Sequence, residues 1–285
     1  MNRNTRRLAA NAISRVFMYG FAVLALVPLA LILIYVVIQG LPALLHIEFF
    51  LNAERPEGIP GGGIANAFAG TVVMVGIASV IAIPIGIVSG VQLVEYGRGS
   101  RIADGVRLAC DVLVSIPSIV IGLFIYGLLV VTFHGPNGFF GALALAILML
   151  PVVVRTTESA VALVPGALRE AGLALGLARW RVALQLILPA AIPGVVTGAL
   201  LAVARAAGET APLLLTTVGN VFLTFDPGQR MTALPLTLYH DALQPYPDLV
   251  RTAWGAALVL VLLTLLVNVL SRLALRRQIR MAGRI

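Results

Sequence analysis

Four charged residues stand inside, or at the edges of, otherwise apolar stretches of this sequence. They form two pairs, Arg155 with Glu158 and Arg205 with Glu209, spaced three and four residues apart. At these spacings two side chains share one face of a helix and can form an ion pair. Each charge costs roughly 2.5–3.5 kcal/mol at the centre of a membrane helix, so it is expected to face a cavity or a partner. The pairs either lock a helical bundle or line a route for an anion, because the arginine fork suits oxyanions.

A break in the helical pattern follows the second pair. Pro212 has no N–H group, and its ring disfavours the helical conformation for Ala211. Irregular backbone at membrane depth is tolerated where it lines a cavity, and Thr210 would supply a hydroxyl there. The break lies either at that depth or at the outer interface, and residues 210–225 are expected to form a short or re-entrant piece. The predicted translocation residues, with Arg205 first and Glu209 as its moderating partner, are Arg155, Arg205, Glu209 and Thr210.

The elements that must position these residues are membrane helices. The chain has 285 residues, of which 60% are hydrophobic and 11% charged, against about 45–50% and ~25% in soluble domains. A spanning helix needs about 20 mostly apolar residues. We predict an all-α membrane protein, a single membrane domain over residues 1–285, with six transmembrane helices at residues 16–38, 64–94, 112–133, 138–160, 182–207 and 252–271.

The basic residues exclude several kinds of chemistry. All 20 are arginine, whereas a Walker A phosphate loop, a Schiff base and a Ser–Lys dyad each need a lysine. Any ATP would therefore be hydrolysed by another subunit, and we expect neither an enzyme nor a cofactor in this chain. The single cysteine, Cys110, rules out an internal disulfide framework. An intramembrane enzyme and a passive anion channel remain as alternative classes of protein to a membrane subunit that relies on a separate ATPase.

Arginine placement predicts the orientation. Fifteen arginines fall in segments on the side of the N-terminus, three on the other side and two within spans. Because positive charge is enriched on the cytoplasmic side, both termini are predicted to be cytoplasmic. The outer residues 39–63 are expected to hold a short amphipathic helix that either docks a soluble partner or covers the span ends.

The loop between the fourth and fifth spans, residues 165–189, is long and only sparsely charged. Pro165 precedes a helical pattern over residues 166–175 and Gly176 closes it, which matches the usual placement of proline and glycine at helix ends. Its small residues, such as Ala167 and Ala174, permit close approach of another surface. Connectors between helices are usually shorter, so we expect a docking element on the cytoplasmic side.

This loop resembles the EAA motif of ATP-binding-cassette (ABC) importer permeases. The motif spacing is kept, with two departures: Gly172 stands for the second alanine and Leu186 for isoleucine. The resemblance implies the type I ABC importer permease fold and a coupling helix that sits in a cleft of the ATPase subunit. The coupling positions that it implies are Glu170, Ala171, Gly172 and Gly176.

Further blocks of sequence narrow the resemblance to the phosphate-specific permeases of these importers. It implies a subunit that moves inorganic phosphate across the cell inner membrane, with a sister permease, two ATPase subunits and a periplasmic phosphate-binding protein. Molybdate or sulfate remains the alternative substrate. Residues 1–60 carry no such block and are assigned by topology alone. The matching blocks are GGGIANAFAGT at 61–71, EYGRGS at 95–100, SIPSIVIGLF at 115–124, VVVRTTE at 152–158 and ARAAGETAPLL at 204–214.

Overall fold

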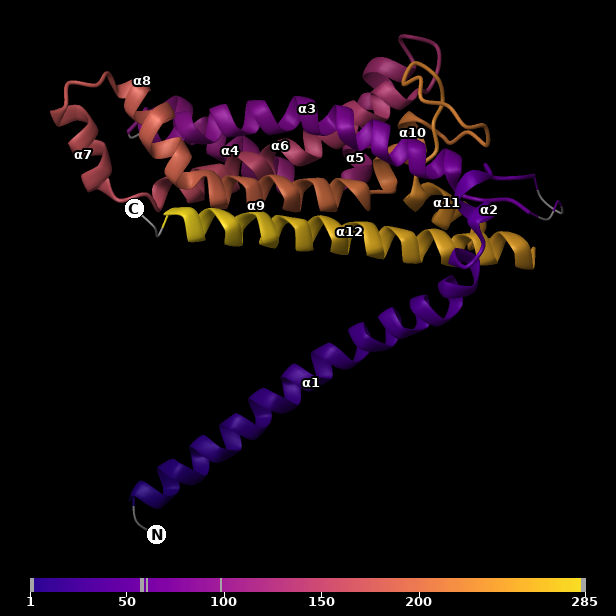
Figure 1. Cartoon of the computed structure of the whole chain (residues 1–285), viewed down its shortest axis with the longest axis horizontal. Helices are drawn as coiled ribbons and strands as arrows, with labels where there is room; N and C mark the ends of the chain where they lie inside the picture. Colours follow the sequence, from indigo (N-terminus) through magenta and orange to yellow (C-terminus); the bar gives the residue numbers. More distant parts are fainter. Residues whose placement is uncertain (1–2, 57–58, 60, 98, 283–285) are drawn as a thin grey trace.

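The helices predicted from the sequence assemble into an elongated bundle (Figure 1). The computed structural model describes residues 3–56, 59, 61–97 and 99–282; Arg98 and Arg284, both counted in the topology prediction, lie outside the described residues. Within those ranges all regular structure is helical. The elements are α1 (Arg3–Leu44), α2 (Ile47–Leu51), α3 (Ala65–Glu95), α4 (Arg101–Ser115), α5 (Ser118–Ile125), the π-helical η1 (Tyr126–Val130), α6 (Gly138–Ala162), α7 (Gly166–Ala174), α8 (Arg179–Val182), the π-helical η2 (Ala183–Ile187), α9 (Leu188–Ala207), α10 (Ala211–Thr216), α11 (Leu234–Asp241) and α12 (Pro247–Ala282).

Within the described residues, six segments can cross a membrane when one bent pair of helices is counted as a single span. Five of these six are long and apolar enough on their own, and they contain or closely match the predicted spans 16–38, 64–94, 138–160, 182–207 and 252–271. The predicted all-α fold with six spans is therefore confirmed. The five segments are Ile13–Leu44, Ala65–Glu95, Gly138–Ala162, Arg179–Ala207 and Pro247–Leu270.

The predicted span over residues 112–133 is not one continuous helix. α4 ends at Ser115, α5 begins at Ser118, and the two helices are bent by 102°. Pro117 causes the break, because its ring disfavours the helical conformation for Ile116, whose ψ is 131°. The third span is therefore the α4–α5 pair. Because α4 runs in a different direction from α5, its charged side chains can face α6.

α6 lies at the centre of the bundle and packs against α3, α9 and α4. Small residues allow the close approach. A Cβ atom added to Gly90 of α3 would lie 2.6 Å from Cβ of Thr157, and one added to Gly198 of α9 would overlap Oγ1 of Thr156. Any side chain at either glycine would push the helices apart. Because α6 has several neighbours, its different faces contribute to different sites.

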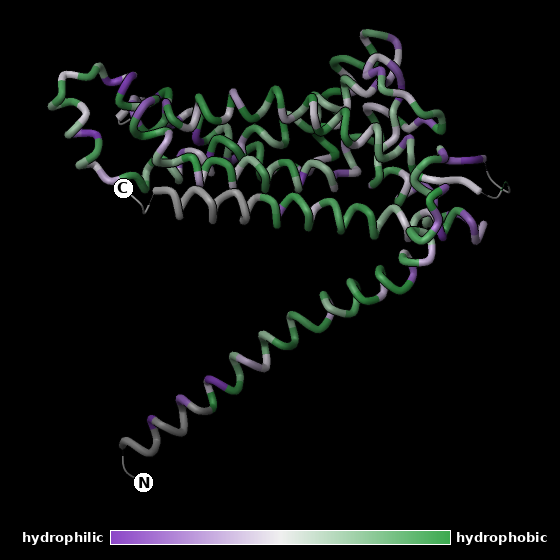
Figure 2. The backbone as a smooth tube through the Cα atoms, viewed as in Figure 1, coloured by the Kyte–Doolittle hydropathy of each residue, from purple (hydrophilic) through white to green (hydrophobic). Residues whose placement is uncertain are grey.

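α1 stands apart from the other helices along most of its length (Figure 1). Only its last turns are held: the rings of Tyr35 and Trp254 pack edge to face with centroids 5.1 Å apart, and a Cβ atom at Gly40 would meet the Trp254 carbonyl at 2.6 Å. Within the described residues, 0% of its most apolar window is buried, although Figure 2 shows apolar residues along most of it. Such a surface needs lipid or another membrane chain around it.

The two ends of the bundle differ in what covers them. One end of the bundle carries α7 and the last turns of α12, and the first turns of α1 point toward the same side but stand apart from the bundle (Figure 1); we call it the α7 end. At the other, the α2 end, Phe49 of α2 is only 6% exposed and packs with Ala43, Ile64 and Leu234. Of the two interpretations of residues 39–63, this burial favours a cover over the helix ends. The helix itself is just the five residues of α2, since α1 runs on to Leu44.

Candidate functional site

The predicted coupling helix is α7, and its C-terminus has a defined hydrogen-bond pattern. The N–H group of Leu177 bonds the Gly172 carbonyl at 3.2 Å, and that of Gly176 bonds the Leu173 carbonyl at 2.9 Å. This is the Schellman arrangement, whose penultimate residue adopts a left-handed conformation. Gly176 does so with a φ of +80°, and a Cβ atom there would meet nothing within 4 Å. The glycine is therefore required by the backbone conformation and not by lack of space.

The two positions at which the loop departs from the EAA pattern touch each other. A Cβ atom added to Gly172 would lie 2.7 Å from Cδ1 of Leu186 and 3.0 Å from a methyl carbon of Val182. Gly172 is buried in this contact. The leucine thus occupies the space that an alanine methyl at position 172 would need, so the two departures compensate each other sterically.

Arg169 anchors α7 to the end of α3, which the sequence did not reveal. Its Nε donates to Oε1 of Glu95 at 2.8 Å, and its terminal nitrogens donate to the carbonyls of Val164 and Val161 at 2.8 and 3.0 Å. The pair is largely shielded, with 17% and 13% of the two side chains exposed. Glu170 and Ala171, in contrast, are exposed and available to another subunit.

Arg205, Glu209 and Thr210 form one of the two predicted charged sites. Nε of Arg205 lies 3.5 Å from Oε1 of Glu209, and 49% of the arginine side chain is exposed. Thr210 is half-buried and stands at the N-cap of α10, without a side-chain capping bond. The pair borders a small depression that α6 lines with Leu148, Met149 and Val152. These residues lie near the middle of α6, so the guanidinium lies beside the middle of a span.

The break after Arg205 is present as predicted. α9 ends at Ala207 and α10 begins at Ala211. α10 is embedded and not superficial: Pro212, Leu213 and Thr216 are buried, and a Cβ atom at Gly122 of α5 would lie 2.6 Å from Cα of Pro212. The irregular backbone therefore lies against protein, the setting in which a membrane protein tolerates it.

Arg155 belongs to a different site, a charge cluster between α4 and α6. Its terminal nitrogens contact Asp111 of α4 at 2.5 Å and Glu158 at 3.0 Å, and its Nε donates to Asp111 at 3.1 Å. Glu158 also accepts a 2.7 Å hydrogen bond from Nε of Arg107. We call this group the α4–α6 cluster: Asp104, Arg107, Asp111, Arg155 and Glu158.

The four predicted translocation residues are thus divided between two places. Arg155 follows Val152 by three residues on α6, about one helical turn closer to the α7 end, and it faces α4, whereas Arg205 lies on α9. Three carboxylates and two guanidiniums give the α4–α6 cluster a formal charge of −1. Arg155 is therefore fully engaged, while Arg205 keeps an exposed guanidinium with one loose partner.

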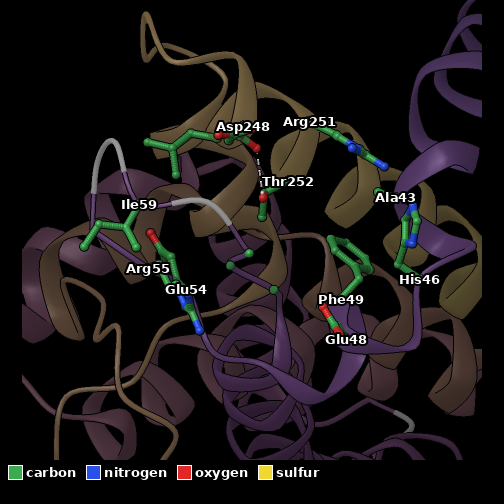
Figure 3. Close-up of a pocket in the computed structure, with 14 residues that line it drawn as sticks. Ala43, His46, Glu48, Phe49, Glu54, Arg55, Ile59, Asp248, Arg251 and Thr252 are labelled. Atoms are coloured by element: carbon green, nitrogen blue, oxygen red, sulfur yellow. Dashed lines mark hydrogen bonds between the residues drawn. The ribbon is translucent and has the colours of Figure 1, made fainter.

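The α2 end holds a further group of polar residues, away from both arginine sites. A cavity of about 250 Å³ is lined by acidic and basic side chains, among them His46, Glu48, Arg55 and Arg251 (Figure 3). Arg251 also donates to the Pro42 carbonyl at 3.1 Å and so ties α12 to α1. The mixed charges make this end polar, as expected for a surface in contact with water.

One buried carboxyl group lies near that cavity. Asp241 at the end of α11 is only 2% exposed, and its burial, together with the neighbouring Glu54, raises its pKa to about 7. Burial also raises the pKa of Glu54. Two carboxyl groups this close cannot both ionise easily, so the pair holds a proton under mildly acidic conditions.

The helical bundle and the anchored α7 loop define the class of protein, and comparison with known proteins agrees. The family model described as "Binding-protein-dependent transport system inner membrane component" matches residues 82–280, a range that contains every predicted translocation and coupling residue. The chain belongs to this family of multi-pass membrane permease subunits, which are not enzymes themselves.

Full-length relatives then specify the branch of the family. The chain is 40% identical over 266 residues to the phosphate transport system permease protein PstA of Yersinia pestis, covering 93% of this chain and 90% of that protein. The PstA of Haemophilus influenzae is 41% identical over 275 residues, covering 95% and 97%. PstA 1 of Mycobacterium tuberculosis (strain ATCC 25618 / H37Rv) is 38% identical over 268 residues, covering 92% and 86%. The chain belongs to the PstA family.

Solved structures support the type I ABC importer permease fold. The structure titled "Inward facing conformations of the MetNI methionine ABC transporter" matches with a TM-score of 0.61 and 21% identity, covering 76% of this chain and 94% of that one. An amino acid ABC transporter matches with a TM-score of 0.53 and 18% identity. At this level of identity the likeness establishes the fold and says nothing about substrate.

Proposed function

We propose that this chain is the membrane-spanning permease subunit of an ATP-driven importer and that it carries inorganic phosphate across the cell inner membrane. The observation that carries the proposal is the full-length similarity to PstA permeases, which includes the α7 loop and both arginine sites. These relatives favour phosphate over molybdate or sulfate. The sequence, residues 1–285, is proposed to form a single permease domain.

The anion path is proposed to run past Arg205. Its guanidinium is half exposed, lies beside the middle of α6, and is only loosely held by Glu209. An arginine there offsets the cost of moving an anion out of water through charge-assisted hydrogen bonds. Glu209 limits how tightly the anion is held, because passage needs binding that is favourable but weak. Thr210 adds a hydroxyl group at the break between α9 and α10. Arg155 is proposed as the second arginine of the path, ranked below Arg205 because carboxylates already hold its guanidinium.

The coupling helix is proposed to dock onto one of two ATPase subunits. Its free face presents Glu170 and Ala171 to a partner, while Arg169 fixes it to α3 and the Gly172 and Gly176 positions set its packing and exit. Movement of the partner would thus reach α3 directly. The first turns of α1 point toward the same side as α7, and the last turns of α12 lie near it (Figure 1). Docking of an ATPase subunit at α7 would therefore put the start of α1 and the end of α12 on the cytoplasmic side, in line with the predicted orientation.

Two other surfaces of the chain suit the two remaining proposed partners, a sister permease and a phosphate-binding protein. The exposed apolar length of α1 is suited to a sister permease subunit in the membrane. The polar α2 end, with the mixed-charge cavity of Figure 3, then faces the periplasm, where a phosphate-binding protein would deliver the substrate.

Reconstitution tests this function. The chain, its sister permease and the ATPase subunits are placed in proteoliposomes with the binding protein outside the membrane. We expect uptake of labelled phosphate that requires ATP and that excess sulfate or molybdate does not compete away. Uptake of sulfate or molybdate in preference to phosphate would overturn the substrate, and phosphate flux without ATP would overturn the importer class.

A further inference from the structure

Asp111 holds Arg155 in the way that a bound oxyanion would. Its two carboxylate oxygens face Nη2 of Arg155, each at 2.5 Å, and one of them also accepts from Nε at 3.1 Å. This two-pronged contact uses the same edge of the guanidinium with which arginine binds phosphate groups. An anion that is to reach Arg155 along this edge must therefore take the place of the Asp111 carboxylate.

We propose that Asp111 is a positioning residue for transport: it acts as a built-in anion that occupies Arg155 until phosphate displaces it, and this displacement releases α4 from α6. The proposal rests on the proposed function, since it takes phosphate as the anion. It assigns to α4 a role that neither the motif nor the predicted translocation residues contain.

The contacts of α4 indicate that its charged residues hold it to the bundle. Much of its apolar surface is uncovered by this chain, with Ile102 81% exposed and Leu108 65% exposed. Its buried contacts with the bundle are few, chiefly Ala103 and Cys110 against Leu93 and Val154. The bend at Pro117 separates it from α5. Loss of an ion pair to α6 therefore removes a large share of what fixes α4.

A second attachment limits how far α4 moves. Arg107 remains bound to Glu158 through Nε at 2.7 Å and to the Leu93 carbonyl at 3.1 Å when Asp111 lets go. α4 is thus expected to loosen at its end near the bend and to stay attached near Arg107. The positive charge of Arg155 favours the return of Asp111 after the anion has left, because the attachment at Arg107 keeps α4 close.

Cys110 offers a direct readout, because it is the only cysteine of the chain and lies next to Asp111. Its side chain is only 6% exposed, covered between α4 and the bundle. When α4 loosens, Cys110 becomes accessible to a maleimide reagent. Modification of this chain can be followed by mass spectrometry in the assembled complex, without replacing any residue.

The experiment measures the rate of Cys110 modification in the complex with and without inorganic phosphate. In the wild-type chain, millimolar phosphate is expected to speed modification about fivefold, the scale of a partly exposed ion pair, and chloride at equal ionic strength is not. Asp111→Asn is expected to give fast modification that phosphate no longer changes. The matched control is Asp104→Asn, which removes the same charge from the same helix but leaves Arg155 paired, and it should respond to phosphate like the wild type.

The outcomes are decisive in either direction. Equal acceleration by chloride would show charge screening in place of anion exchange and would overturn the proposal. So would slow modification in Asp111→Asn, or a phosphate response that survives in Arg155→Gln. These rates do not depend on uptake, so failure of the proposed function, seen as no phosphate transport by the wild-type complex, is recorded separately in proteoliposomes.

Discussion

The two intramembrane arginines lie in opposite kinds of surroundings. Among the described residues Arg205 pairs with Glu209, four residues further along the chain, and the contact is loose at 3.5 Å. Arg155 has two partners, one of them 44 residues away on α4, and the contacts are as short as 2.5 Å. A local, loose pair leaves a guanidinium available to a passing anion, whereas a long-range cluster commits it. The comparison teaches that two arginines at similar depth can differ in how available their guanidinium groups are to a ligand.

The largest effect is expected at the loosely held arginine. Arg205→Gln keeps most of the side-chain length and removes the charge, so ATP-driven phosphate uptake should fall roughly 100-fold, about 2.7 kcal/mol. The complex should still assemble, because the lost contact is weak. Arg205→Lys should restore part of the uptake, since a point charge lacks the fork. Equal uptake by Arg205→Gln and wild type, at equal amounts in the membrane, would contradict the proposed role of Arg205 in the anion path.

A large effect is also expected at the exit of the coupling helix, which is fixed by local backbone geometry. Gly176→Val places a β-branched residue at positive φ and should uncouple ATP hydrolysis from uptake, leaving the chain in the membrane. Gly176→Asn is the matched control, because asparagine tolerates this conformation and the site has room. Uptake and ATPase rates are measured together; normal coupling in the valine variant would contradict the role given to this turn.

A smaller effect on uptake is expected at the tightly held arginine. Arg155→Gln leaves Asp111 and Glu158 without their shared partner, so we expect about a tenfold loss of uptake accompanied by less assembled complex and a melting temperature lower by a few degrees. The ratio of uptake to assembled protein separates the two arginines. If that ratio falls as far as in Arg205→Gln, the distinction between them is lost.

What could be predicted from the sequence follows the same division between local and long-range contacts. Five spans, the α7 helix, the glycine at its exit and the Arg205–Glu209 spacing all depend on residues close together in the chain. The ion pairs of Arg155 with Asp111 and of Arg169 with Glu95 join residues 44 and 74 positions apart. Helical periodicity cannot assign such partners, because they depend on how the helices cross.

In the third span the sequence contained a helix-breaking signal, Pro117, but the length of the uncharged run outweighed it. Pro117 follows Ile116 inside an uncharged run, and that run was long enough to span as one helix. The structural break moved Asp111 onto a separate helix that lies against α6. The error in the span therefore hid the partner of a predicted site residue, so that Arg155 was grouped with Arg205.

A pH-dependent effect is expected at the α2 end, where the contact is again long-range. The raised pKa of Asp241, about 7 against 3.8, means that the folded chain binds more protons than the unfolded chain between about pH 4 and 7. The free energy of unfolding should therefore fall as the pH rises through this window. Asp241→Asn stays neutral and should flatten that dependence in thermal unfolding of the complex. An unchanged pH profile in Asp241→Asn would contradict the assignment of this pH dependence to Asp241.

The smallest effect concerns the compensating pair in the coupling loop. Gly172→Ala brings a methyl group against Leu186 and should destabilise the loop by about 1–3 kcal/mol through overpacking. Adding Leu186→Ile, which restores the EAA pattern at both positions, should recover most of the lost coupling. Thermal stability and ATPase coupling are compared in the single and double variants. A double variant as impaired as Gly172→Ala alone would show that the two positions do not compensate.

The central claim, that Arg205 serves the anion and not only Glu209, is tested most directly by the double variant Arg205→Gln, Glu209→Gln in reconstituted phosphate uptake. This variant removes both charges of the pair and so removes any cost of leaving one unpartnered. The account predicts that uptake stays as low as in Arg205→Gln alone, with normal assembly and normal phosphate binding by the binding protein. Uptake restored to the wild-type level would contradict it and leave Arg205 and Glu209 as a pair that only locks the bundle.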